Sequence, residues 1–221
     1  MRPLTDSIPK ALIPVNGVPF ASHQLDRLAR EGVDHVVYSI GYRGDLVREH
    51  VGDGGRWGLA VDYVDEGDKL RGTAGALRFA LDEGVLRDRF FVLYGDSYLP
   101  IALGPVWKAF DEARLPALMT VLRNEGRWDR SNAAVEDRLV TIYDKSGADT
   151  NEPLDWIDYG LSALQRSVVE ARVPAGEAAD LADLFRELSA DRLLGAFEVE
   201  ERFFEIGSPT GLSELERYLR T

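Results

Sequence analysis

Strand-like and helical segments alternate along the first half of the chain, and this alternation limits the possible folds more than any other feature. Apolar runs rich in β-branched and aromatic residues are separated by helical segments. The predicted strands cover residues 34–40, 59–64, 89–94 and 117–122, and the predicted helices cover residues 19–32, 45–50, 73–81 and 106–113. Because the connections are short, we expect a mainly parallel sheet with helices on both faces.

The second half of the chain changes to a mixed pattern of short strands and helices. The predicted elements are a β-hairpin of residues 133–136 and 139–143, strands at 156–164 and 196–200, and helices at 167–171, 181–188 and 209–219. No Pro/Gly/Ser-rich linker divides the chain, so residues 1–221 are interpreted as a single domain. We predict an α/β fold whose mixed, mainly parallel central sheet carries a small antiparallel elaboration.

Composition excludes several classes of protein. The chain has 221 residues with 26 Lys and Arg against 38 Asp and Glu, a formal net charge of −12, and no cysteine. Disulfides and thiolate zinc sites are therefore excluded. Nucleic acid and anionic membranes are not expected partners, because both attract cationic surfaces. No apolar run approaches the roughly 18 residues of a membrane-spanning helix, and the N-terminus lacks a signal-peptide core, so we expect a cytoplasmic protein.

Two carboxylates are candidate ligands for a metal ion. Asp96 follows the apolar run 89–94 directly after Gly95, and Glu205 lies between apolar neighbours ahead of Gly207. Ligands of open α/β sheets bind beyond the carboxyl ends of the strands, and carboxylate oxygens suit Mg²⁺. Taken alone, each residue is better explained as an ordinary turn or capping acid.

Two lysines are candidates for phosphate binding. Lys10 lies in an apolar loop between Pro9 and Pro14, where burying its charge without a partner would be costly. A phosphate would be a suitable partner, but a surface lysine whose stem covers apolar residues explains the pattern equally well. Lys145 follows the predicted hairpin, a place where exposed lysines are usually solvated.

The sequence Gly72-Thr73-Ala74-Gly75 opens a predicted helix. Small residues at a helix start let a flat ring or a phosphate approach the backbone N–H groups. An N-capped, tightly packed helix start explains this motif better when it is taken alone. The three histidines are scattered without a metal-ligand spacing and are interpreted as structural.

The order of these signals is more informative than any one of them. In chain order they are Arg2-Pro3-Leu4-Thr5, Pro9-Lys10-Ala11-Leu12-Ile13-Pro14-Val15, Gly72-Thr73-Ala74-Gly75-Ala76, Gly95-Asp96, Asp144-Lys145, Asp158-Tyr159-Gly160 and Glu205-Ile206-Gly207-Ser208-Pro209. This set spans nearly the whole chain and resembles the sugar-1-phosphate nucleotidylyltransferases. The length resembles compact bacterial members similar to mannose- or heptose-1-phosphate guanylyltransferases and muramate-1-phosphate uridylyltransferases. The resemblance implies a Rossmann-like, three-layer nucleotide-diphospho-sugar transferase fold.

The resemblance also implies a reaction and a set of site residues. A nucleoside monophosphate would pass from a nucleoside triphosphate to a sugar 1-phosphate, giving pyrophosphate and a nucleoside-diphosphate sugar for cell-envelope polysaccharide synthesis. Mg²⁺ would be the cofactor, held by Asp96 and Glu205, and relatives are often oligomers, so a homo-oligomer is a further expectation. The catalytic residues would be Lys10, Asp96 and Lys145, the nucleotide-binding residues Arg2, Lys10, Gly72 and Thr73 in the N-terminal half, and the sugar-phosphate-binding residues Asn132, Lys145, Asp158 and Gly160 in the C-terminal half.

Two departures from the family pattern leave an alternative open. Glu205 stands where many relatives carry Asp, and its extra methylene would shift a bound metal. A first strand and a Gly-Gly-x-Gly-Thr-Arg phosphate loop, which relatives place just before the segment matched by Arg2, are missing, and we expect the true start to lie upstream of Met1. The alternative is a non-catalytic sugar-nucleotide-binding or regulatory relative that has lost this loop. A glycosyltransferase is disfavoured, because Gly95-Asp96-Ser97-Tyr98 provides no Asp-x-Asp metal motif.

Overall fold

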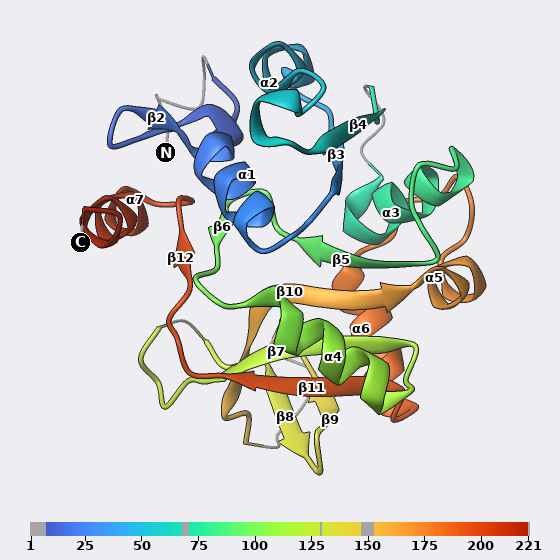
Figure 1. Cartoon of the computed structure of the whole chain (residues 1–221). Helices are drawn as coiled ribbons and strands as arrows, with labels where there is room; N and C mark the ends of the chain where they lie inside the picture. The colour runs from blue at the N-terminus through green and yellow to red at the C-terminus, as the bar shows by residue number, and fades with distance from the viewer. Residues whose placement is uncertain (1–7, 68–70, 129, 147–152, 221) are drawn as a thin grey trace. The chain divides into compact units, whose positions relative to one another are not determined.

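The computed structural model describes residues 8–67, 71–128, 130–146 and 153–220 (Figure 1). The chain divides into two compact units. The first unit comprises Met1–Leu70, Tyr94–Tyr98 and Phe203–Thr221, and the second comprises Arg71–Leu93 and Leu99–Arg202. The interpretation of residues 1–221 as a single domain remains a prediction, and the two compact units are described separately. Along the described ranges, no helix combines the length and the apolar character that crossing a membrane requires.

The first unit contains paired strands and helices that enclose two apolar clusters. Its helices are α1 (Phe20–Arg30), α2 (Gly44–Val51) and α7 (Pro209–Tyr218), and its strand pairs are β1 (Pro14–Val15) with β2 (Val18–Pro19), β3 (His35–Ile40) with β4 (Ala60–Asp65), and β6 (Ser97–Tyr98) with β12 (Phe204–Glu205). One cluster packs Phe20 against Ile206 and Leu215. The other packs Leu25 of α1 with Val47 of α2. β3 and β4 are parallel, as the alternation of strand and helix predicts.

A tight hairpin orders the proline-rich opening segment, in which the sequence predicts no regular element. Asn16 and Gly17 connect β1 to β2 with φ values of +50° and +81°, the two positive values that a type I′ turn requires. The Asn16 N–H donates to Glu216 Oε1 of α7, and Asn16 Nδ2 donates to the Glu216 carbonyl at 2.9 Å. The segment therefore has a fixed course, which matters because it carries Lys10 in a short 3₁₀ helix, Lys10–Leu12.

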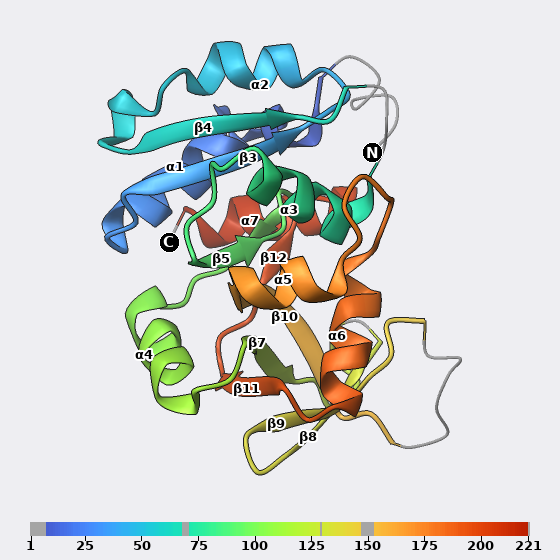
Figure 2. The same ribbon diagram turned by 90° about the vertical axis from the view of Figure 1, so that its right-hand side faces the viewer.

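The second unit is built around one six-stranded sheet with the order β5-β10-β7-β11-β9-β8. Its strands are β5 (Arg89–Leu93), β7 (Ala117–Arg123), β8 (Ala133–Glu136), β9 (Leu139–Tyr143), β10 (Trp156–Gln165) and β11 (Leu194–Val199), and its helices are α3 (Gly72–Asp82), α4 (Leu103–Ala113), α5 (Arg166–Arg172) and α6 (Leu181–Ala190). Figures 1 and 2 together show α4 and α6 on opposite faces of this sheet. Helices on both faces explain why β7 is buried along nearly its whole length.

The sheet of the second unit is mixed, as the sequence predicts, but its neighbouring strands are mostly antiparallel. β7 and β11 pair in parallel, whereas β10 runs antiparallel to both β5 and β7. Strands β5, β7 and β11 therefore point in one direction, although β10 separates β5 from β7. The expectation of mainly parallel neighbours is corrected here, because the insertion of β10 depends on long-range pairing that local sequence does not encode.

Two local irregularities shape the part of this sheet nearest to the predicted sugar-phosphate residues. The predicted hairpin forms as β8 and β9, and Asp137 and Arg138 turn the chain with φ values of +49° and +62°. In β10 the register shifts between Asp158 and Ser162, and Gly160 within this shift has a φ of +97°. A residue with a side chain would be strained at that φ, so the glycine permits the bulge.

Candidate functional site

Lys10 and Asp96 form an ion pair in the first unit. Lys10 Nζ lies 3.1 Å from Asp96 Oδ2, and the two side chains are 52% and 32% exposed. Gln24 of α1 donates hydrogen bonds to the carbonyls of Tyr94 and Ser97, and it thereby holds the turn that presents Asp96. An ion pair this exposed contributes at most about 1 kcal/mol to stability. A phosphate or a cation can therefore replace either partner at little cost.

Strand pairing brings the second predicted metal ligand next to Asp96. In the antiparallel pair of β6 and β12, Glu205 lies opposite Ser97, and the Ile206 N–H donates to the Asp96 carbonyl at 3.0 Å. Glu205 is exposed. A Cβ placed at Gly207 would lie 3.9 Å from Asp96 Oδ2, so this glycine leaves room beside the carboxylate. Asp96 and Glu205, 109 positions apart in the chain, thus flank the same short strand pairing.

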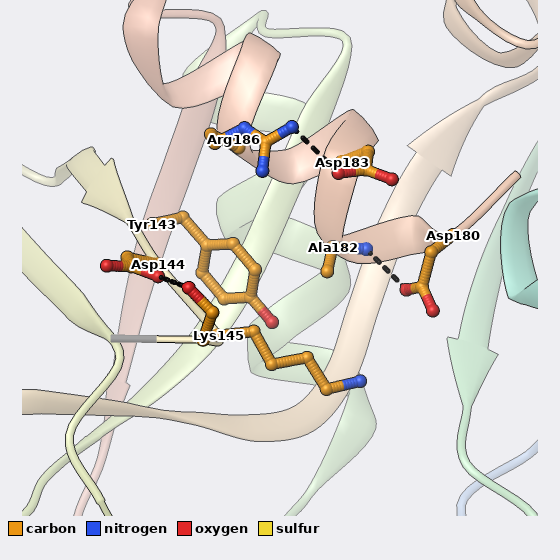
Figure 3. Close-up of a pocket in the computed structure, with 8 residues that line it drawn as sticks. Tyr143, Asp144, Lys145, Asp180, Ala182, Asp183 and Arg186 are labelled. Carbon is orange, nitrogen blue, oxygen red and sulfur yellow. Dashed lines mark hydrogen bonds and ion pairs between the residues drawn. The ribbon is translucent and has the colours of Figure 1, made fainter. Parts of the chain in front are cut away.

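Lys145 lies on a pocket of about 310 Å³ in the second unit. Figure 3 shows its side chain extended, with the amine toward the side of the pocket where Asp180 lies. Asp180 caps the start of α6 by accepting a hydrogen bond from the Ala182 N–H at 2.9 Å. The pocket is lined by Tyr143, Asp144, Lys145, Ser146, Asp180, Ala182, Asp183 and Arg186.

A network of hydrogen bonds centred on Asp158 includes Tyr143, which lines the pocket. Asn132 Oδ1 accepts from the Asp158 N–H at 2.8 Å, and the Asp158 carboxylate accepts from the Gly160 N–H at 2.9 Å and from the Tyr143 hydroxyl at 3.2 Å. Burial raises the pKa of the Asp158 carboxyl, while these two hydrogen bonds and the nearby charge of Lys145 act in the opposite direction. The structure therefore brings together the four residues predicted to bind the sugar phosphate: Asn132, Lys145, Asp158 and Gly160.

The predicted base-binding motif is packed tightly against another segment of its own unit. Gly72 has a φ of +69°, and a Cβ there would lie 2.5 Å from the Ala179 carbonyl oxygen. That oxygen accepts from the N–H groups of Ala74 and Gly75 at the start of α3. Thr73 Oγ1 donates to Asp180 Oδ1 and accepts from the Leu181 N–H at 2.8 Å. Close packing accounts for the small residues, and a contact of Gly72 or Thr73 with a base stays a prediction. Arg2 lies outside the described residues.

Comparison with known proteins decides the family. Residues 1–130 match the family model described as nucleotidyl transferase. The chain belongs to the nucleotidyl transferase family. The mannose-1-phosphate guanylyltransferase of Mycobacterium tuberculosis is 31% identical over 195 residues, which cover 87% of this chain and 50% of that protein. The D-glycero-α-D-manno-heptose 1-phosphate guanylyltransferase of Campylobacter jejuni is 23% identical over 145 residues, which cover 66% of this chain and 63% of that protein.

Solved structures confirm the expected fold. The inositol-1-phosphate CTP transferase from T. maritima superimposes with a TM-score of 0.79 at 20% sequence identity, covering 100% of this chain and 89% of that chain. The Rossmann-like nucleotide-diphospho-sugar transferase fold is therefore present in this chain. The chain spans about half the length of the first curated relatives it matches, between 50% and 52% for three of them.

The resemblance implies Mg²⁺ as the cofactor, and the residues present fit that ion. Asp96, in the turn just before β6, and Glu205, opposite Ser97 on β12, offer carboxylate oxygens, and Asp96 is released from Lys10 at little cost. Within the ranges that the structure describes, no group of three His, Cys, Asp or Glu side chains forms a complete metal cage. Mg²⁺ is commonly held by one or two carboxylates, with water and substrate phosphates completing its shell.

Tyr143 and Asp180 belong to the Lys145 pocket, although no sequence motif marks either residue as functional. A signal for Asp180 exists, because an Asp just before the apolar helical run 181–188 is a typical N-cap. That signal indicates a helix start rather than a pocket. In the sequence, Tyr143 is typical of an apolar strand residue. Only the pairing of β8 with β9 and β10 places its hydroxyl beside Asp158.

Proposed function

We propose that this protein transfers a nucleoside monophosphate from a nucleoside triphosphate to a sugar 1-phosphate, in a reaction that requires Mg²⁺. The observation that carries the proposal is the exposed Lys10–Asp96 pair, whose Asp96 directly precedes the strand β6 that pairs with Glu205 of β12. A cation and two carboxylates that cost little to separate suit a polyanionic substrate and a divalent ion. Membership of the nucleotidyl transferase family supports the same chemistry.

In the proposed reaction, a phosphate oxygen of the sugar 1-phosphate forms a bond to the α-phosphorus of the triphosphate. The bond from that phosphorus to the bridging oxygen breaks, and pyrophosphate leaves with the electron pair. Lys10 would contact the triphosphate and offset its charge, and Asp96 and Glu205 would hold Mg²⁺. When bound, Mg²⁺ supplies neutralisation of charge on the phosphate oxygens. Catalysis then consists mainly of positioning and electrostatic stabilisation.

The second unit would bind the sugar phosphate. Lys145 is exposed on the pocket and would contact the phosphate group, while Asp180 presents a carboxylate that can accept hydrogen bonds from sugar hydroxyls. Asn132, Asp158 and Gly160 hold the bulged part of β10 in place through hydrogen bonds. The relatives named for mannose 1-phosphate and for a heptose 1-phosphate support a hexose or heptose 1-phosphate as the substrate class.

The test is a pyrophosphate-release assay on the full chain. Each of the common nucleoside triphosphates is paired with mannose 1-phosphate or glucose 1-phosphate, with Mg²⁺ or with EDTA. We expect release with at least one pair, only with Mg²⁺, and its loss in Lys10→Ala and in Lys145→Ala. Lys108→Ala is the matched control, because Lys108 is 76% exposed and lies on α4. Binding of a sugar nucleotide without any release would favour the non-catalytic alternative.

Two further expectations accompany the proposed activity. Nucleoside triphosphates are cytoplasmic metabolites, so a cytoplasmic enzyme that supplies nucleoside-diphosphate sugars for cell-envelope polysaccharides follows from the reaction class. Cell fractionation tests the compartment. Light scattering on the purified protein tests the expected homo-oligomer, and a monomeric mass would contradict it.

A further inference from the structure

Among the described residues, Trp128 is one of the few large apolar side chains that are exposed, with 42% of its surface accessible. Exposure of a single aromatic residue is common in soluble proteins and by itself indicates no function. Three further observations distinguish Trp128: the loop that carries it is held in place, its ring is covered in part by an arginine, and its loop is bonded to the Lys145 site.

The loop that carries Trp128 is fixed by a buried asparagine. Asn124 is 1% exposed, and its Oδ1 accepts from the Trp128 N–H at 3.1 Å while its Nδ2 donates to Ser131 Oγ at 3.0 Å. Its backbone N–H also donates to the Asp155 carbonyl. Glu125 in this loop has a φ of +48°, an unfavourable conformation for a residue with a side chain. Residues 124–128 are therefore held in a fixed course that leaves the indole exposed.

Arg202 lies over the ring of Trp128. Its guanidinium carbon is 4.2 Å from the ring centroid, within the range of a cation–π interaction. Trp128 follows β7 and Arg202 follows β11, and these strands are parallel neighbours. The pair thus lies beyond the carboxyl ends of two adjacent strands, the side of an α/β sheet where ligands bind.

Hydrogen bonds connect the same loop to the residues around Lys145. Arg130 Nη1 donates to the carbonyl of Ser146, the residue after Lys145, at 3.1 Å. At the end of the loop, Asn132 is bonded to the backbone of Asp158. Arg130 and Asn132, which follow Trp128 in the sequence, are thus bonded to the network that supports the proposed sugar-phosphate site.

We propose that Trp128, with Arg202 against its ring, is a stacking surface for the sugar ring of the sugar phosphate and helps to determine which sugar the protein accepts. This inference rests on the proposed function. The C–H face of a pyranose ring packs on an indole, and the 42% of Trp128 that remains exposed provides such a surface. An arginine beside it can donate hydrogen bonds to hydroxyl groups at the edge of the ring.

The test compares steady-state kinetics of Trp128→Ala and Trp128→Phe with the unmodified protein, using mannose 1-phosphate and glucose 1-phosphate. We expect Trp128→Ala to raise the KM for the sugar phosphate about five- to tenfold and Trp128→Phe to raise it less, because Phe keeps part of the ring. The KM for the nucleoside triphosphate should change less than about twofold. Tyr42→Ala is the matched control, since Tyr42 is an exposed aromatic residue with the Arg43 guanidinium over its ring in the first unit.

A second readout separates stacking from a structural role. Binding of mannose 1-phosphate and of inorganic phosphate, without nucleotide, is measured by isothermal titration calorimetry. Stacking predicts that Trp128→Ala weakens binding of mannose 1-phosphate and keeps the affinity for inorganic phosphate, whereas a structural role weakens both equally. If the unmodified protein turns over and the sugar-phosphate KM is unchanged in both Trp128 variants, the inference is wrong and the proposed function stands. If the unmodified protein neither turns over nor binds a sugar phosphate through Lys145, both fail.

Discussion

The two units of the protein present their candidate site residues in opposite ways. In the first unit, Lys10 of a short 3₁₀ helix and Asp96 of a turn form an exposed pair. In the second unit, Asp158 is half-buried and accepts hydrogen bonds from a backbone N–H and from the Tyr143 hydroxyl. In the first unit, a substitution can therefore change activity with little effect on the free energy of unfolding, because an exposed ion pair contributes little to it. The arrangement in the second unit links binding to stability, because unpaired buried donors are costly.

The largest expected effect is on activity, in the first unit. Asp96→Asn keeps the shape of the side chain but removes the charge that would hold Mg²⁺, so we expect turnover to fall by a factor of about 10² or more. Stability should change by less than about 0.5 kcal/mol, because the pair with Lys10 is exposed.

Pyrophosphate release and urea unfolding measure the two quantities for Asp96→Asn. Asp62→Asn is the control, since Asp62 is 58% exposed and paired with His35 in the same unit. Normal turnover in Asp96→Asn would show that the metal assignment is wrong. A large loss of stability would remove the contrast between the units.

The next effect is on stability, in the second unit. Asp158→Ala leaves the Gly160 N–H and the Tyr143 hydroxyl without their acceptor, so we expect a loss of about 2–3 kcal/mol in the free energy of unfolding. Asp158→Asn keeps one carbonyl oxygen as an acceptor and should lose less than half of that. Urea unfolding of both variants measures the difference. Equal stability of all three proteins would mean that the network does not support the pocket.

Glycine substitutions test the packing of the second unit more finely. Gly72→Ala places a Cβ 2.5 Å from the Ala179 carbonyl oxygen at a φ of +69°, whereas Gly84→Ala places one in open space at a φ of +75°. Both should pay about 1–2 kcal/mol for the left-handed conformation, and Gly72→Ala should lose a further amount of about 1 kcal/mol or more from the contact. Thermal unfolding of the two variants gives the comparison. Equal melting temperatures would contradict the close packing at Gly72.

The smallest effect is a pH dependence in the first unit. Ser22 Oγ accepts from Arg56 Nη2 at 3.2 Å and lies within hydrogen-bond distance of His50 Nε2, at 2.9 Å. Burial lowers the pKa of His50, and the charge of Arg56 acts in the same direction. As pH falls below about 6.5, the unfolded chain gains this proton before the folded chain does, and stability decreases.

A matched variant isolates the contribution of His50. His50→Gln keeps a hydrogen-bond acceptor for Ser22 and has no titrating group. We expect the unmodified protein to lose stability relative to His50→Gln between pH 7.5 and pH 5, measured by urea unfolding at each pH. A difference that does not vary with pH would show that His50 keeps its ordinary pKa.

The elements of the fold were largely predictable from sequence, because hydrophobic period and turn residues are local. Asp137 and Arg138 mark a two-residue hairpin turn, and the structure has it. The insertion of β10 between β5 and β7 was not predictable, because the pairing of Leu161 with Leu93 depends on contacts far apart in the chain. Local sequence sets the period of a strand but not its neighbour.

The candidate site divides in the same manner. Lys10 and Asp96 were assigned to the site by the order of the motifs and the resemblance that it carries, but only the structure shows that they meet, 86 positions apart. Trp128 looks like any loop residue until Asn124 and Arg202 are placed around it. Residues whose role depends on several distant partners leave no local signal in a single sequence.

The most direct test of the proposed function is phosphorus-31 NMR of the full chain with Mg²⁺, a nucleoside triphosphate and mannose 1-phosphate or glucose 1-phosphate. The account predicts that pyrophosphate and a nucleoside-diphosphate sugar form in equal amounts with at least one substrate pair, and that neither forms when the sugar phosphate is left out. Spectra unchanged for every pair, or phosphate released without a sugar phosphate, would contradict it.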